Sequence, residues 1–266
     1  MRGGMRRYAA VLRTAARRQS IYRAEIVMRM IQMVLFMCVF IALWQAIYRT
    51  SGRTALEGFT LIDMVWYLAM TETVVLSSSR VFTEISEKVK AGDVVYTLAR
   101  PMSYPFYQVA YSLGGSVPRF VLNFVTAVVV VTVGTGRVAG SLEGLGAFLA
   151  TAALALVLDA LIAVLIGLLA FWIEEVTPAF WIYQKLLFTV GGLFLPLDLF
   201  PKGLERVARW LPFRFVTYVP ARSFVAFDPG FVLRSMGGQV IYIAVLGALL
   251  VLIWQQARRR MVIHGG

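Results

Sequence analysis

Six long apolar stretches occupy most of the 266-residue chain and constrain its fold more than any other feature. Crossing the hydrocarbon core of a bilayer, which is about 30 Å thick, takes about 20 mostly apolar residues at a helical rise of about 1.5 Å per residue. The stretches reach that length with modest extension into their flanks, and their centres are Val34–Ala46, Leu61–Leu76, Val121–Val133, Phe148–Phe171, Trp181–Leu197 and Val240–Trp254. We therefore predict an all-α membrane protein with six transmembrane helices in a single domain over residues 1–266.

The composition supports a membrane protein built from helices. Hydrophobic residues make up 59% of the chain and the mean hydropathy is +0.75, which is more apolar than one soluble core can hide. Runs of Ala, Leu, Val and Gly without a ten-residue alternation are not typical of an outer-membrane barrel. The first apolar run begins near Met30 and is followed by a poor cleavage site, so we expect the first span to be retained.

The positions of the Lys and Arg side chains predict the orientation, because cationic loops are held on the cytoplasmic side during insertion. Eight arginines precede the first span and three follow the last one, so both termini are predicted to be cytoplasmic. The loop over residues 77–105 falls on the same side. One basic stretch contradicts this rule, because the count places it outside; it contains Lys202, Arg206, Arg209, Arg214 and Arg222.

The cytoplasmic N-terminus, residues 1–29, contains an amphipathic pattern from Met5 to Tyr22. Apolar residues recur there at helical spacing, with arginines roughly opposite them, which favours an interfacial helix on the inner leaflet. A topology signal without fixed structure is the alternative. The net charge of +12 is concentrated beside the spans, so membrane phospholipid is a better counter-charge for it than nucleic acid.

Several kinds of catalytic or metal site are excluded by the residue inventory. The chain has a single cysteine, Cys38, within the first span, and a single histidine, His264, near the C-terminus, so an intrachain disulfide or a His/Cys metal cluster is not possible. The serines at 77–79 have no histidine base available and are interpreted as the end of a span. No Gly-x-x-x-x-Gly-Lys-Ser/Thr loop occurs, so we expect no ATP site and no bound cofactor in this chain.

The inner loop, residues 77–105, is predicted to hold a short amphipathic helix followed by a turn. Phe82, Ile85 and Val89 form its apolar stripe, and Gly92 stands where a left-handed C-terminal cap is expected. The stripe has two possible destinations, which are the chain's own spans and a groove on a soluble subunit. The polar faces carry Glu84, Glu87, Lys88 and Lys90. The second inner loop, Trp172 to Pro178, is short and acidic. It is either a lesser contact with the soluble subunit or a solvated turn.

The region between the fifth and sixth spans, residues 198–229, is predicted to be an outer hairpin. Pro196 and Pro201 interrupt a continuous helix, and Asp198 is expected to cap a new one with Pro201 in its first turn. Irregular backbone at membrane depth is tolerated only where protein or water satisfies it, so we expect an outer gate here. Its residues are Gly191, Gly192, Pro196, Asp198 and Pro201.

With these two loops in place, the sequence resembles the permease subunits of ATP-binding cassette (ABC) transporters, in the six-span branch of about 260 residues of the type 2 export class. The resemblance covers the whole chain. Its most specific parts are Glu84–Asp93 with Leu98–Pro105, and Gly191–Pro201 followed by Leu211–Phe213. It implies an N-terminal elbow helix, a cytoplasmic coupling helix and a re-entrant outer hairpin before the last span.

The resemblance also implies partners and a mechanism. Such permeases pair with a second permease, identical or homologous, and with two ATPase subunits that bind ATP and Mg²⁺, in a bacterial or archaeal inner membrane. ATP closes the ATPase subunits, and the coupling helix transmits that movement to the spans, either by alternating access or by lateral expulsion of substrate. The residues expected to contact the ATPase are Arg80, Glu84, Glu87, Lys88 and Asp93.

Charged residues within the spans are the remaining candidates for chemistry, because an unpaired charge in the membrane is costly. Asp159 and Glu72 are the deepest. Asp159 is interpreted either as an interhelical hydrogen bond or ion pair, with Arg119 as a candidate partner, or as a group of the translocation path. The second interpretation supports a proton-coupled carrier or channel. Such a carrier would need acidic residues on one face, whereas Asp63 and Glu72 fall on opposite faces of one helix and cannot form one relay. The two halves of the chain also lack the internal repeat that many secondary carriers have. An intramembrane enzyme lacks any cluster from which to build a site.

Overall fold

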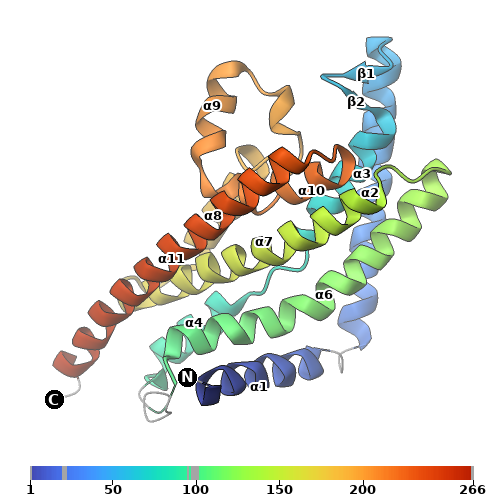
Figure 1. Ribbon diagram of the computed structural model, residues 1–266. Coiled ribbons are helices and arrows are strands. Elements are labelled where there is room, and N and C mark those ends of the chain that lie inside the picture. The colour runs from blue at the N-terminus through green and yellow to red at the C-terminus, as the bar shows by residue number, and fades with distance from the viewer. Residues whose placement is uncertain (1, 20–22, 95, 97–101, 265–266) are drawn as a thin grey trace.

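Long helices run between two ends of the molecule in the computed structural model (Figure 1), which describes residues 2–19, 23–94, 96 and 102–264. The end that holds α1 (Arg2–Gln19), α4 (Val81–Lys90) and the C-terminus is called the α1 end, and the opposite one, with α9 (Lys202–Trp210) and a small hairpin, the α9 end. Four helices within the described residues are long and apolar enough to cross a membrane. Their spans are Val27–Ser51 in α2 (Arg23–Ser51), α6 (Tyr104–Thr135), Leu142–Phe171 in α7 (Leu142–Leu168) with η1 (Leu169–Phe171), and Pro229–Arg260 in α11 (Pro229–His264).

The predicted second and fifth spans correspond to shorter helices. The helix α3 (Leu61–Val75) has 15 residues and α8 (Thr177–Thr189) has 13, so α8 rises only about 20 Å at about 1.5 Å per residue. The apolar run from Trp181 to Leu197 is not one continuous helix, because α8 ends at Thr189 and Gly192 follows with a φ of 79°. Such a positive φ favours glycine, which has no Cβ to clash with the backbone. The six-span count therefore stays a prediction.

The short helix α3 forms the centre of the bundle. An antiparallel hairpin of β1 (Ala55–Leu56) and β2 (Phe59–Thr60) leads into it, and Thr60 and Asp63 cap its first turn reciprocally. Asp63 is therefore a helix-capping residue. From Met64 to Val74 every side chain is buried, and Trp66 and Tyr67 are among the largest of them. A helix that is buried on all sides needs no amphipathic pattern, which explains why the apolar residues of α3 are not confined to one face.

The N-terminal helix α1 packs against α6 along a close contact at Gly114. A Cβ atom placed on Gly114 would lie 2.4 Å from the Leu12 carbonyl oxygen and 2.7 Å from the Ala15 Cβ, so only glycine allows this approach. The predicted amphipathic helix is confirmed over Arg2–Gln19, with Arg13 and Arg17 exposed, while Tyr22 lies outside the described residues. Its apolar side covers protein at α6. Whether the helix lies on the inner leaflet stays a prediction.

Short elements at the α9 end follow the break after α8. They are η2 (Leu197–Leu199), α9, η3 (Pro212–Phe215) and α10 (Tyr218–Val225). Asp198 does not cap α9 as expected, because the cap position is Pro201. Instead, Asp198 accepts a hydrogen bond from the Tyr218 hydroxyl at 2.9 Å and lies 3.7 Å from the Arg222 guanidinium. Asp198 therefore joins the start of the predicted outer hairpin, residues 198–229, to the helix α10 near its end.

Three of the five residues in the basic stretch that breaks the orientation rule, Arg209, Arg214 and Arg222, have partners within the fold. Arg209 forms an ion pair with Glu205, and Arg214 lies over the Phe215 ring at 4.4 Å. Arg222 has both the Asp198 carboxylate and the face of the Phe231 ring, at 4.2 Å, as partners. These three arginines are thus held by partners within the chain, and the side of the membrane on which the basic stretch lies stays a prediction.

Candidate functional site

The helix α4 lies at the α1 end with its apolar stripe turned towards α7 and α8. Phe82 and Ile85 are both buried, and the Phe82 ring stacks on the Phe180 ring of α8. A Cβ placed on Gly167 of α7 would lie 2.9 Å from the Ile85 Cδ1 and 3.0 Å from the Phe82 Cα. Of the two destinations expected for the stripe, the structure therefore shows the first, since it packs on the chain's own helices.

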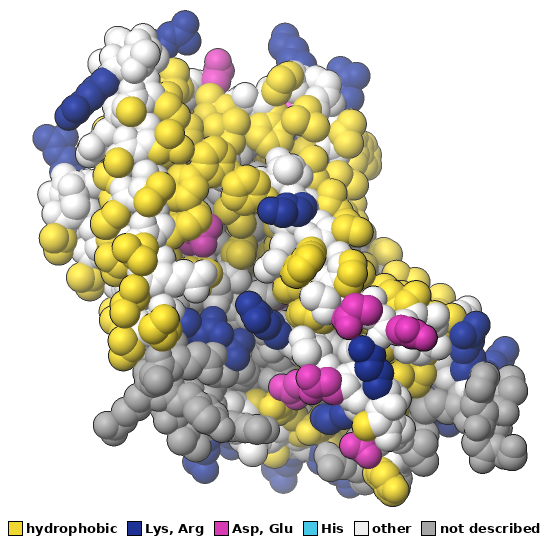
Figure 2. Space-filling view, turned by 180° about the vertical axis from the view of Figure 1, so that it is seen from behind, with side chains coloured by type: hydrophobic (Ala, Val, Ile, Leu, Met, Phe, Trp, Pro, Cys, Tyr) yellow, Lys and Arg dark blue, Asp and Glu magenta, His cyan; other side chains and the backbone are white. Residues whose placement is uncertain are grey.

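The polar side of α4 remains open. Arg80, at the N-cap position, and Glu87 are exposed, Glu84 and Lys88 are half-buried, and Asp93 is exposed in the turn after the helix. Gly92 has a φ of 74°, as expected for the left-handed cap. Figure 2 shows acidic and basic side chains close together on the lower part of this face, below a mostly hydrophobic upper part. The motif residues Leu98 to Pro101 lie outside the described residues.

The second inner loop binds the end of α4. The Lys90 ammonium lies 3.4 Å from the Glu175 carboxylate, whose other oxygen accepts hydrogen bonds from the Thr177 hydroxyl at 2.6 Å and the Thr177 N–H at 3.0 Å. The Thr177 hydrogen bonds, followed by the Lys90 contact, lower the pKa of Glu175 to about 2. The loop is therefore tied to α4 of the same chain, and its contact with an ATPase stays a prediction. A groove of about 590 Å³ beside it is lined by Val89, Lys90, Ala170, Phe171, Trp172, Ile173 and Glu174.

Asp159, in the middle of α7, holds three elements together. Its carboxylate accepts hydrogen bonds from the Ser78 hydroxyl at 2.7 Å and from the Tyr183 hydroxyl of α8 at 2.8 Å. Arg119 of α6 donates to the Ser78 carbonyl oxygen at 3.2 Å. The expected interhelical hydrogen bond of Asp159 is therefore present, and Arg119 meets it through Ser78 rather than by a direct ion pair. No sequence pattern distinguished Tyr183, as a partner of Asp159, from the other ten tyrosines of the chain.

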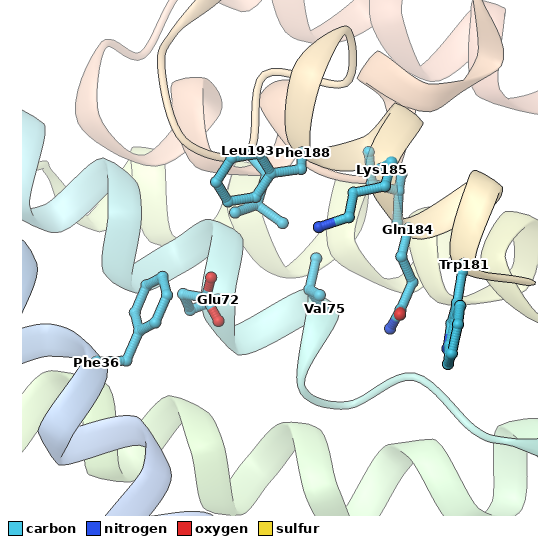
Figure 3. A pocket seen from close by; sticks show the side chains of 9 residues that line it. Phe36, Glu72, Val75, Trp181, Gln184, Lys185, Phe188 and Leu193 are labelled. Carbon is cyan, nitrogen blue, oxygen red and sulfur yellow. The ribbon is translucent and has the colours of Figure 1, made fainter.

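Glu72, by contrast, faces a cavity of about 420 Å³ between α2, α3 and α8. Figure 3 shows Phe36 beside it, and Gln184, Lys185 and Trp181 of α8 on the other side of the cavity. The Glu72 side chain is 5% exposed, whereas Lys185 and Trp181 are open to the surroundings. Within the part of the chain that the structure describes, no side chain forms a hydrogen bond or ion pair with the Glu72 carboxylate. Asp159 and Glu72 thus occupy separate places with different partners.

The predicted outer gate is a buried turn whose carbonyl groups are satisfied by side-chain hydroxyls. Thr217 donates to the Gly191 carbonyl at 2.6 Å, Tyr67 to the Gly192 carbonyl, and Thr71 to the Leu193 carbonyl at 3.0 Å. Non-helical backbone at membrane depth requires such internal partners. The sequence predicted an interruption from Pro196 and Pro201, but no pattern indicated that hydroxyls of α3 and of Thr217 stabilise the turn before them. Pro201 lies at the start of α9, away from this turn in sequence and exposed.

Comparison with known families identifies the chain. A family model described as ABC-2 family transporter protein matches residues 26–265, which is nearly the whole chain, and the comparison with curated proteins found no match. The chain therefore belongs to the ABC-2 family of transporter proteins. It is a multi-pass membrane protein and a permease component of an ABC transporter, distinct from the subunit that hydrolyses ATP.

Proposed function

We propose that this chain is the membrane-spanning permease of an ATP-driven exporter, in which two permeases form the translocation pathway and separate ATPase subunits supply the energy. Both termini and α4 face the cytoplasm of a bacterial or archaeal cell in this arrangement. The basic residues before α2 and after α11 support that orientation. The α9 end then faces outward, and the shorter helices α3 and α8 complete six crossings together with the elements that follow them.

The observation that carries this proposal is the two-sided character of α4. Its apolar residues are held between α7 and α8, through the Gly167 contact and the Phe82–Phe180 stack, while its charged residues remain accessible. A helix held in this way moves together with the spans it touches. A soluble subunit that binds Glu84, Glu87 and Lys88 would therefore transmit its movement to α7 and α8.

The second inner loop extends this contact surface. The Lys90–Glu175 ion pair links the end of α4 to the start of α8, and the groove beside them lies between the two loops. The ATPase is proposed to bind chiefly to the polar side of α4, with Arg80 and Asp93 at its margins, and secondarily to this groove. On the opposite side of the membrane, the buried turn at Gly191 and Gly192 is proposed to act as the outer gate.

Affinity purification tests the proposal. The tagged protein would be purified in mild detergent from its native host, with mass spectrometry of the co-eluting proteins and an ATPase assay on the eluate. We expect a soluble ATPase to co-elute, and to be lost from a Glu84→Arg, Glu87→Arg variant. A matched control is the Glu57→Arg, Glu143→Arg variant, in which the charge of two exposed acidic residues at the α9 end is reversed. This variant should retain the ATPase.

Two results would contradict the proposal. The first is that the wild-type protein elutes without any ATPase under conditions that preserve membrane complexes, so that no ATPase is available to drive transport. Retention of the ATPase by the Glu84→Arg, Glu87→Arg variant would show that α4 is not the contact surface. In the first case, proton-coupled transport would be measured in liposomes with Asp159→Asn and Glu72→Gln, which would test the carrier hypothesis directly.

A further inference from the structure

The cavity beside α3 holds the buried Glu72 carboxylate, for which no described residue supplies a counter-charge. The side chain is 5% exposed, and the described residues around it offer neither an ion pair nor a hydrogen bond. Lys185 lines the same cavity, but no ion pair within 4.0 Å joins the two groups, and its side chain is exposed. An acidic group within a membrane protein is normally paired or directed at water or a ligand. Glu72 has the position of a ligand-binding group.

Three aromatic side chains, Phe36, Trp181 and Phe188, line this cavity, and further rings behind it connect Phe36 to Phe188. Phe36 of α2 lies against Phe40, with centroids 4.1 Å apart, and Phe40 meets Phe194 edge-on at 4.9 Å. Phe194 in turn stacks on Phe188 of α8, with centroids 5.5 Å apart. This row of rings runs from one wall of the cavity to the other, and Trp181 adds an exposed indole nearby (Figure 3). Aromatic faces attract cations through their quadrupole, and more strongly when water is excluded.

We propose that this cavity binds an organic cation, with Glu72 as its counter-ion and the aromatic rings in contact with its apolar body. The proposal rests on the permease role and names the class of substrate. An anion would be repelled by the buried carboxylate. A metal ion would find one carboxylate and mostly apolar walls, whereas Ca²⁺ takes about six to eight oxygen ligands. The volume of about 420 Å³ lies within the range of about 300–1,000 Å³ typical of small-molecule sites.

The position of the cavity is suited to a ligand that arrives from the membrane. On α8 the exposed side chains include Trp181 and Ile182, each 63% exposed, and on α2 they include Leu35 and Val39. Because α2 and α8 also form walls of the cavity, an amphiphilic cation can approach along these apolar helices and neutralise Glu72 on binding. Lys185 at the rim bears the same charge as such a ligand. It should therefore weaken binding rather than support it.

A pair of ions of nearly equal shape and opposite charge tests the proposal. Radiolabelled tetraphenylphosphonium would be titrated onto the full-length protein in lipid nanodiscs, against empty nanodiscs, and tetraphenylborate would be measured in the same way. We expect saturable binding of the phosphonium and weaker binding of the borate. Glu72→Gln should weaken phosphonium binding about tenfold or more, while Lys185→Gln should strengthen it. Phe188→Leu should weaken phosphonium binding a few-fold.

The control is Glu143→Gln, an exposed acid at the start of α7 outside the cavity, which should bind the phosphonium as the wild type does. Elution volume and thermal stability would confirm that each variant is folded. Equal phosphonium affinity of the wild type and Glu72→Gln, or no saturable binding above empty nanodiscs, would overturn the proposal. Either result would leave the permease role intact, because the assay needs no ATPase, and that role is tested separately by co-purification.

Discussion

The ring of Phe82 in α4 stacks on the ring of Phe180 in α8, with centroids 4.0 Å apart and ring planes inclined by 19°. Both side chains are at most 5% exposed. The stack joins a helix of the first inner loop to the helix that borders the Glu72 cavity. A displacement of α4 is therefore passed on to α8 by direct contact, without an intervening flexible segment.

The Phe82–Phe180 contact predicts a measurable coupling energy. In a double-mutant cycle with Phe82→Leu and Phe180→Leu, we expect the two losses of stability to be non-additive by about 0.5–1.5 kcal/mol, the value typical of aromatic pairs. The measurement is unfolding in mild detergent. Phe82→Leu combined with Phe224→Leu, in α10 near the other end of the molecule, is the control and should be additive. Additive losses for the first pair would show that the stack contributes nothing specific.

Gly167 predicts a strict size limit at the contact between α4 and α7. Gly167→Ala places a Cβ 3.0 Å from the Phe82 Cα, which is backbone and cannot rotate away, so α4 must shift. We expect lower thermal stability and weaker co-purification of the ATPase.

Gly146 offers the matched control on the same helix, because nothing lies within 4 Å of its Cβ position. Gly146→Ala should leave stability unchanged or raise it, by up to about 1 kcal/mol from the higher helix propensity of alanine. If both alanine variants behaved alike, the close approach at Gly167 would be irrelevant to the position of α4.

Asp159 is predicted to have a structural role. Asp159→Asn can keep one hydrogen bond to Ser78 or Tyr183, so we expect a loss of about 0.6 kcal/mol, the average for such bonds between membrane helices. Asp159→Leu leaves both hydroxyls without their acceptor and should cost about 1–3 kcal/mol more. Unfolding measurements distinguish the variants. A folded Asp159→Asn protein that bound its ATPase but lost transport would instead favour the translocation-path interpretation.

Glu175 predicts a pH dependence of stability. Its pKa is lower in the folded protein, about 2, than its ordinary value of 4.5, so its contacts stabilise the fold above about pH 4.5. That contribution is lost as the pH falls through about 2. The difference in unfolding temperature between the wild type and Glu175→Gln should be constant from pH 7 to 5 and shrink below that. Glu174→Gln, an exposed neighbour, serves as the control. A difference that grows on acidification would contradict the assignment.

The inner loop shows how far sequence patterns extend. The spacing of Phe82, Ile85 and Val89 predicted the helix α4, and Gly92 predicted its end, because helix periodicity and capping are local properties. The pattern left open what the apolar stripe would cover. The answer depended on Gly167, more than 70 positions away in the sequence, where the absence of a Cβ lets α4 pack closely on α7.

The fifth apolar run shows the reverse case. Hydropathy alone predicted a span from Trp181 to Leu197, whereas α8 ends at Thr189. An apolar stretch lowers the cost of lying in the membrane but does not require one continuous helix. The break is stable because Thr217, Tyr67 and Thr71 donate to its carbonyl groups, and these hydroxyls come from distant segments.

The sequence by itself determined that the chain is a helical membrane protein, that a short helix ends just before Gly92, and which acidic residues lie deepest. These properties follow from composition, from local periodicity and from the cost of placing a charge in an apolar medium. Only the tertiary structure decided that Asp159 is satisfied by Ser78 and Tyr183 while Glu72 faces an aromatic cavity. Which groups surround a buried carboxylate depends on how distant helices pack, and no local pattern encodes that.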